Sequence, residues 1–149
     1  MIYKTHIAIG VMLAFLFFPY VTNKWVFVPI VLFASLMPDI DSAYSYLGHK
    51  RIFRPLQFFV QHRGVIHSFT FCLLVSAIFA FFIPILALPF FLGYAGHLFA
   101  DSLTIEGIRP FWPLHGESAG SIRVGGKVES SIFFFLIIID LALLIYLII

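Results

Sequence analysis

Long apolar runs separated by short polar connections make up most of the chain. Five apolar runs stand out, at residues 7–21, 25–37, 68–83, 85–100 and 131–149. A helix needs about 20 residues to cross a typical bilayer, and its backbone must satisfy its own hydrogen bonds in lipid. The pattern therefore predicts an all-α, multi-pass transmembrane bundle of about five segments, forming one domain over residues 1–149.

The first two runs are shorter than a full crossing. They reach the required length if residues 4–6 and 23–24 are included, or they form a hairpin that dips partly into the bilayer. Pro84 and Pro89 interrupt the apolar stretch between the third and fourth runs, where a tight turn is needed. We expect that turn to span both prolines.

Composition supports a membrane protein and excludes other classes. The chain is 62% hydrophobic and 11% charged, whereas soluble domains are about half apolar and about a quarter charged. A net charge of +2, with basic residues spread between apolar runs, argues against nucleic acid. The single Cys72 allows no disulfide within the chain, and no small-x-small cleavage site follows the first run. We therefore expect the first run to be retained.

The distribution of basic residues predicts the orientation. With five crossings and a cytoplasmic N-terminus, eight of the nine Lys and Arg residues lie on the cytoplasmic side, and only Lys24 lies outside. The positive-inside rule favours this arrangement. We expect a multi-pass protein of the cell (inner) membrane, with the lipid bilayer as its surroundings.

Seven ionisable residues fall at the predicted cytoplasmic ends of four segments. They are His6, Asp39, Asp41, His62, His67, His97 and Asp101. Ionisable groups next to lipid are costly, so their gathering at one depth indicates a functional site.

The spacing of these residues is consistent with one cluster. His97 and Asp101 are four residues apart and share a helix face, with Gly93 one turn earlier to allow close helix approach. His6 and Gly10 repeat that spacing on the first segment.

The remaining four residues of the set lie near segment ends. Asp39 and Asp41 follow a proline, which predicts an extended turn. His62 is expected on the loop before the third segment, and His67 in the first turn of its helix.

The donor set is imidazole and carboxylate, without thiolate. This suits zinc above all, or manganese or iron(II). Seven candidate ligands exceed one tetrahedral site, so either one or two ions are expected, and two ions clamp both oxygens of a phosphoryl transfer. His49 and His115 are expected to be simple interfacial residues, and Asp140, near the middle of the last segment, is left outside the site.

The combined motifs resemble a family of small membrane-bound, metal-dependent hydrolases of the LexA-regulated type. The motifs that carry the resemblance are Thr5-His6 with Gly10, Pro38-Asp39-Ile40-Asp41, His62-Arg63-Gly64 with His67-Ser68, Gly93 with His97 and Asp101, and Leu103-Thr104 with Gly107 and Pro110. The resemblance continues through Arg123 and Gly125-Gly126 to Glu129, and departs from the family at Ile66, where threonine is usual. It implies the same seven metal ligands, and the pattern is loosely similar to zinc-dependent phospholipase C enzymes.

These observations predict a hydrolase acting on a phosphoester, or a related ester, of a lipid or membrane-associated substrate. Arg63, Arg109 and Arg123 are candidate phosphate-binding residues, because guanidinium binds phosphate in a bidentate manner. Glu129 is a candidate general base or additional ligand.

Two other functions fit the same residues. A divalent-metal transporter or channel would continue the polar path toward the outer face, but the outer halves of the segments are apolar. A non-catalytic membrane protein with a structural metal would hold it in a closed site with four protein ligands and no open position.

Overall fold

The computed structural model describes residues 1–45, 47–59 and 63–149. Within these residues the regular structure is helical, which confirms the predicted all-α fold. The α-helices are α1 (Tyr3–Phe17), α2 (Lys24–Ala34), α3 (Arg54–Phe59), α4 (Phe69–Phe82), α5 (Pro84–Ser102) and α6 (Lys127–Ile148). Short 3-10 helices form η1 (Phe18–Tyr20), η2 (Met37–Asp41) and η3 (Arg51–Phe53).

All five predicted apolar segments are helical, but their lengths differ. Three described helical stretches are long and apolar enough to cross a membrane: α1 together with η1, α5 and α6. Helix α2 has 11 residues and α4 has 14. At 1.5 Å per residue they extend for about 16 and 21 Å, less than the hydrocarbon thickness of about 30 Å. The structure thus supports three full-length segments and two shorter ones.

Two local predictions are wrong. Pro84 begins α5, where a missing N–H costs no helical hydrogen bond, but Pro89 lies inside the helix instead of in the turn. The turn is therefore a sharp bend at Ile83 and Pro84. Asp39 and Asp41 lie on the 3-10 helix η2 and not on an extended turn, because Pro38 occupies its first turn, where proline is compatible with helical backbone.

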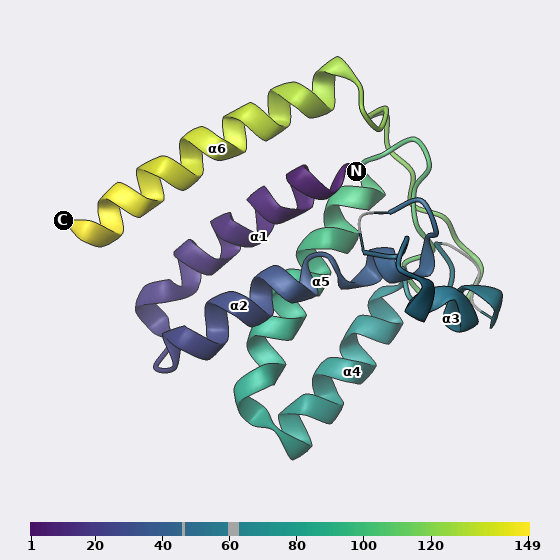
Figure 1. The fold of residues 1–149 in the computed structure, drawn as a ribbon, viewed down its shortest axis with the longest axis horizontal. Helices are drawn as coiled ribbons and strands as arrows, with labels where there is room; N and C mark the ends of the chain where they lie inside the picture. Colours follow the sequence, from purple (N-terminus) through teal and green to yellow (C-terminus); the bar gives the residue numbers. More distant parts are fainter. Residues whose placement is uncertain (46, 60–62) are drawn as a thin grey trace.

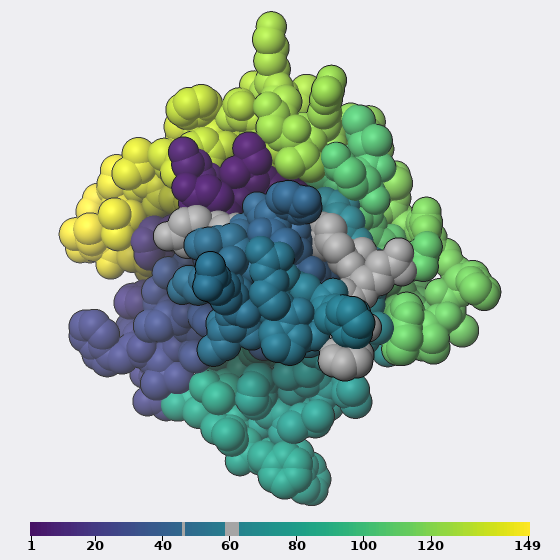
Figure 2. Space-filling model, turned by 45° about the vertical axis from the view of Figure 1, so that its right-hand side comes forward, coloured from purple at the N-terminus to yellow at the C-terminus, as the bar shows by residue number. Residues whose placement is uncertain are grey.

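The helices form one bundle whose polar connections gather at one end (Figure 1). Helix α5 packs against α1, α2 and α4, whereas α6 packs along α1 and runs in the same direction. The N-terminus, α3 and the start of α6 lie at the polar end, and the C-terminus lies at the other. Viewed toward the polar end, the N-terminal residues lie between α6 and the connection that carries α3 (Figure 2).

The outer surface of the bundle is strongly apolar. Helix α6 is the extreme case, since only 11% of its membrane-length window is buried within the protein, and Phe134, Ile138 and Leu141 are exposed. Tyr20 and Trp25, which amphipathic interfaces favour, are exposed at the connection between α1 and α2. This surface matches a lipid environment.

Small residues bring three helices close together below the polar end. A Cβ added to Gly93 of α5 would lie 2.2 Å from the Val31 carbonyl oxygen of α2. A Cβ added to Gly10 of α1 would lie 2.9 Å from the Ser35 Oγ that follows α2. The end of α2 is therefore held against both α1 and α5 by contacts that only glycine permits.

Replacing Gly93 by alanine should force α2 away from α5. The added methyl meets backbone, which cannot rotate aside, so we expect a loss of about 1–3 kcal/mol in the free energy of unfolding. Denaturant unfolding in detergent micelles measures it. Gly96→Ala is the matched control on the same helix, because its Cβ meets chiefly the terminal Cδ1 of Leu13, a flexible side chain. Equal losses in the two variants would contradict the assignment.

Candidate metal centre

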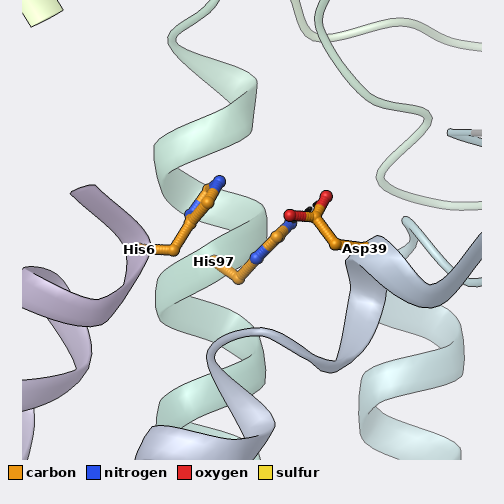
Figure 3. Close-up of side chains that lie close together, drawn as sticks. All are labelled: His6, Asp39 and His97. Carbon is orange, nitrogen blue, oxygen red and sulfur yellow. Dashed lines mark ion pairs between the residues drawn. The ribbon is translucent and has the colours of Figure 1, made fainter. Parts of the chain in front are cut away.

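Residues from four parts of the chain converge at the polar end of the bundle. His6 comes from α1, Asp39 from η2 and His97 from α5, and their side chains lie close together (Figure 3). His67 lies just before α4. Asp101 lies near the end of α5, on the same face as His97. The four-residue spacing of His97 and Asp101 on one helix, with 3.7 Å between His97 Nε2 and Asp101 Oδ2, is as predicted.

Two histidine rings are held by hydrogen bonds at Nδ1. His97 Nδ1 lies 2.8 Å from the Ser35 carbonyl oxygen, and His67 Nδ1 lies 2.9 Å from Asp41 Oδ2. Each bond fixes the ring and leaves Nε2 facing inward. A carbonyl or carboxylate on one ring nitrogen is the usual arrangement for a metal-ligating histidine, because it fixes the tautomer.

The two Nε2 atoms face the same two carboxylates. His97 Nε2 lies 3.7 Å from Asp101 Oδ2 and 3.8 Å from Asp39 Oδ1. His67 Nε2 lies 3.8 Å from Asp101 Oδ2 and 4.0 Å from Asp39 Oδ1. Both histidines are fully buried. His97 Nε2 has no hydrogen-bond partner in the described part of the chain, which is costly for a buried polar atom.

His6 completes the cluster from α1. Its ring stacks on His97, with centroids 3.7 Å apart and planes 12° from parallel, and its Nε2 lies 3.4 Å from Asp101 Oδ1. Among the described residues neither ring nitrogen of His6 has a hydrogen-bond partner, although the residue is fully buried. His6 is therefore positioned by its stacking on His97 and by the contact of its Nε2 with Asp101.

The two carboxylates differ in their surroundings. Asp101 is buried and also contacts the amino group of Met1 and Arg63 Nη2. Asp39 is 15% exposed at its side chain. Burial raises the pKa of Asp39 above its ordinary value, and the charges of His6 and His67 act in the opposite direction. A bound cation would offset this burial cost in the same way.

Arg63 is held beside the cluster by several contacts. Its backbone N–H donates to Asp41 Oδ2 at 3.2 Å, and Nη1 donates to the Gly107 carbonyl at 2.8 Å and to Thr104 Oγ1 at 3.3 Å. Its φ of 62° is a left-handed conformation that costs a non-glycine residue about 1–2 kcal/mol. Such strain persists where surrounding contacts over-determine it.

The other predicted site residues lie elsewhere. Arg109 is exposed and pairs with exposed Glu117 at 3.0 Å, and Arg123 is exposed. His67 precedes α4 instead of lying in its first turn, because Ser68 caps that helix through the Phe71 N–H. His62 lies outside the described residues. Arg63 is therefore the one predicted arginine that the described structure brings to the cluster.

Sequence reasoning missed the groups that complete the surroundings of the cluster. The Ser35 carbonyl that orients His97 is a backbone atom, and no residue pattern reveals it. A pocket of about 290 Å³ opens beside the cluster, bounded by Met1, Ile2, Tyr3, Asp39, Ser42, Tyr44, Ser45, Arg63, Asp101 and Val124. Ser42, Tyr44 and Ser45, which line this pocket with hydroxyl groups, cannot be distinguished from ordinary loop residues in the sequence.

Comparison with known proteins identifies the family. The sequence model of a family described as YdjM inner membrane protein matches residues 1–148. The chain belongs to the YdjM inner membrane protein family. It is 38% identical over 98 residues to the inner membrane protein YdjM of Escherichia coli (strain K12), and equally to that of Shigella flexneri. These alignments cover 60% of this chain and 50% of each relative.

The chain thus spans about half the length of the curated YdjM relatives it matches. No solved structure matches it. Membership in the YdjM family confirms the membrane part of the resemblance predicted from the motifs. Hydrolase activity and metal dependence stay predictions.

Glu129, at the start of α6, holds the N-terminal part of α1. Its Oε1 accepts from the Ile2 N–H at 2.6 Å and from Thr5 Oγ1 at 2.9 Å, and its Oε2 accepts from the Gly125 N–H at 2.7 Å. The side chain is 2% exposed. Because these donors use both carboxylate oxygens, the described contacts give Glu129 the role of fastening α6 to the segment that carries His6.

Glu129→Gln should weaken this junction. An amide replaces one accepting oxygen with a donor, so at least one partly buried donor loses its partner, at a cost of about 1 kcal/mol or more. Hydrogen exchange of residues 1–6 and the unfolding midpoint report the loss. Glu117→Gln makes the same chemical change at an exposed ion pair and should shift stability by less than about 1 kcal/mol. Unchanged exchange at residues 1–6 in Glu129→Gln would refute this role.

Proposed function

We propose that this protein is a metal-dependent hydrolase of the membrane interface. The observation that carries the proposal is the convergence of two oriented, buried Nε2 atoms on two carboxylates, at distances of 3.7–4.0 Å. In the proposal, His67, His97 and Asp101 hold a divalent ion, while Asp39 and His6 lie beside it and leave one coordination position open for water.

The donor set fits such an ion. Zinc binds nitrogen and oxygen at about 2.0–2.2 Å, which gives tetrahedral ligand–ligand distances of roughly 3.3–3.5 Å. Shifts of a few tenths of an ångström toward the ion would bring the observed distances between Nε2 and carboxylate oxygens to these values. Imidazole with carboxylate suits zinc most, and also manganese or iron(II). The buried, unpartnered Nε2 of His97 is the atom that a cation would satisfy.

The described residues favour one centre over two. Two three-residue groups have ligand spacing, His6 with Asp39 and His97, and His67 with His97 and Asp101. His97 Nδ1 is engaged by Ser35, so both groups depend on the same Nε2. One nitrogen lone pair serves one ion.

The pocket beside the cluster favours catalysis over a closed structural site. Asp39 and Asp101 both line it, so a substrate group entering the pocket meets the carboxylates directly. When bound, a divalent ion supplies polarisation of a phosphoryl oxygen and activation of water. Arg63 lines the same pocket and offers a guanidinium to a phosphate.

The substrate class follows from location. The pocket lies at the polar end of a bundle whose long helices match a membrane, so it lies at the level of lipid head groups. A lipid phosphoester, or a related ester held at the membrane, fits this position and the charge of Arg63. The distribution of basic residues places that end in the cytoplasm in this proposal.

Metal analysis of purified protein tests the centre. After dialysis against zinc, the wild type should carry about one ion per chain, and His97→Ala should lose it. Removing an outer hydrogen-bond partner lowers metal affinity by roughly 10–100-fold, and removing a ligand should lower it further. His115→Ala changes an exposed histidine outside the cluster and should keep the ion. Failure of the wild type to retain stoichiometric zinc, manganese or iron would remove the basis of the proposal.

Hydrolysis tests the role of Arg63. Release of nitrophenol from bis(4-nitrophenyl) phosphate and of phosphate from phosphatidic acid should both stop after chelation. Arg63→Lys should lower kcat/KM by about tenfold or more, because lysine cannot bind phosphate in a bidentate manner. Arg109→Lys, at an exposed arginine, is the matched control and should keep the wild-type rate. A metal-loaded protein without activity on either ester would leave a structural metal as the better account.

A further inference from the structure

A second cavity lies between α1 and α6, away from the candidate metal centre. Its volume is about 440 Å³, within the range of small-molecule sites. It is bounded by Lys4, Ile7, Ala8, Val11, Phe15, Phe133, Ile137, Asp140, Leu141 and Leu144. Because both helices are long enough to cross a membrane, the cavity lies at the level of the hydrocarbon.

Asp140 is the polar group inside this apolar cavity. It is 7% exposed, and its Oδ1 is buried without a hydrogen-bond partner in the described part of the chain. A lone carboxyl group in a membrane segment is costly and is usually retained together with a partner. The cavity therefore contains an unsatisfied acceptor, surrounded by aliphatic and aromatic side chains.

Lys4 does not supply the missing partner. It is the second residue of α1, whereas Asp140 is the fourteenth of α6, and the two helices run side by side in the same direction from the polar end. At 1.5 Å per residue, the two positions are separated by roughly 18 Å along the bundle. Lys4 therefore lies at the interfacial end of the cavity and Asp140 lies deep within it.

The position of Asp140 favours a small molecule over a neighbouring helix. The side chain lies in the groove between α1 and α6, whose volume of about 440 Å³ matches a small molecule. A molecule that fits the cavity can enter from the bilayer between Ile137, Leu141 and Leu144, which are exposed. To satisfy Asp140 it must carry a hydrogen-bond donor, and an ammonium group supplies both that donor and a positive charge that pairs with the carboxylate in hydrocarbon.

We propose that the α1–α6 cavity binds a small hydrophobic amine, with its apolar body against the aliphatic and aromatic side chains and its ammonium group donating to Asp140. This site is separate from the proposed hydrolase centre and does not depend on it.

Binding of tritiated adamantan-1-amine to the full chain in phosphatidylcholine nanodiscs tests the proposal. We expect one saturable site per chain above protein-free nanodiscs. The neutral analogue adamantan-1-ol should compete at least about tenfold more weakly, because its hydroxyl group can donate a hydrogen bond but carries no positive charge to pair with the carboxylate. Asp140→Asn should weaken binding of the amine by a similar factor.

The variants separate loss of the site from loss of the fold. Asp140→Asn removes an unsatisfied buried charge, so the unfolding midpoint of the ligand-free protein should stay unchanged or rise. Ile137→Trp fills the cavity from an exposed position and should abolish binding while keeping Asp140. Glu117→Gln changes the same charge at the surface and should bind as wild type. Uptake equal to protein-free nanodiscs, or wild-type binding by folded Asp140→Asn, would overturn the proposal.

Discussion

The close approach of the end of α2 to α1 and α5 is the constraint on which the rest of the polar end depends. Gly93 allows the α2 backbone to reach α5, and the Ser35 carbonyl then meets His97. Gly10 allows the same segment to reach α1, where His6 stacks on His97. With a larger residue at either glycine, the helices would have to separate to make room for the added methyl group. The two stacked imidazoles would then lose their common position.

Hydrogen bonding from outside the cluster explains why buried polar groups are tolerated there. His67 is oriented by Asp41, which also accepts from the Arg63 backbone, and Arg63 in turn reaches Asp101. Tyr94 adds a further link, because its hydroxyl donates to the Ile66 carbonyl at 2.7 Å and so joins α5 to the segment carrying His67. The cluster is thus one connected network in which the inward nitrogens face carboxylates. That arrangement, more than the presence of histidine, supports the proposed chemistry.

Most of the fold followed from hydropathy, because lipid leaves the backbone few alternatives to helix. The convergence of His6, Asp39, His67, His97 and Asp101 also followed, since each lies at the same end of a segment. The apolar pattern already marked the run that forms α2 as short, but it did not reveal that α4 is also too short for a full crossing, because the apolar run continues past the helix end. The contacts of Glu129 could not be predicted, because its partners are two backbone N–H groups and Thr5, none of which stands out in the sequence. The sequence shows that Asp140 is isolated within an apolar segment. The cavity beside it could not be predicted, because it depends on how α1 packs on α6.

The contacts of Glu129 also have a consequence for biogenesis. They join α1 to α6, so the hydrogen bonds that fasten the segment carrying His6 are complete only after α6 has been synthesised and placed in the bilayer. A nascent chain that has been synthesised as far as α5 already contains the cluster residues, but it lacks the hydrogen bonds that Glu129 accepts from Ile2 and Thr5. Completion of these contacts is therefore coupled to the insertion of α6 into the membrane, so a chain without an inserted α6 presents the cluster without them.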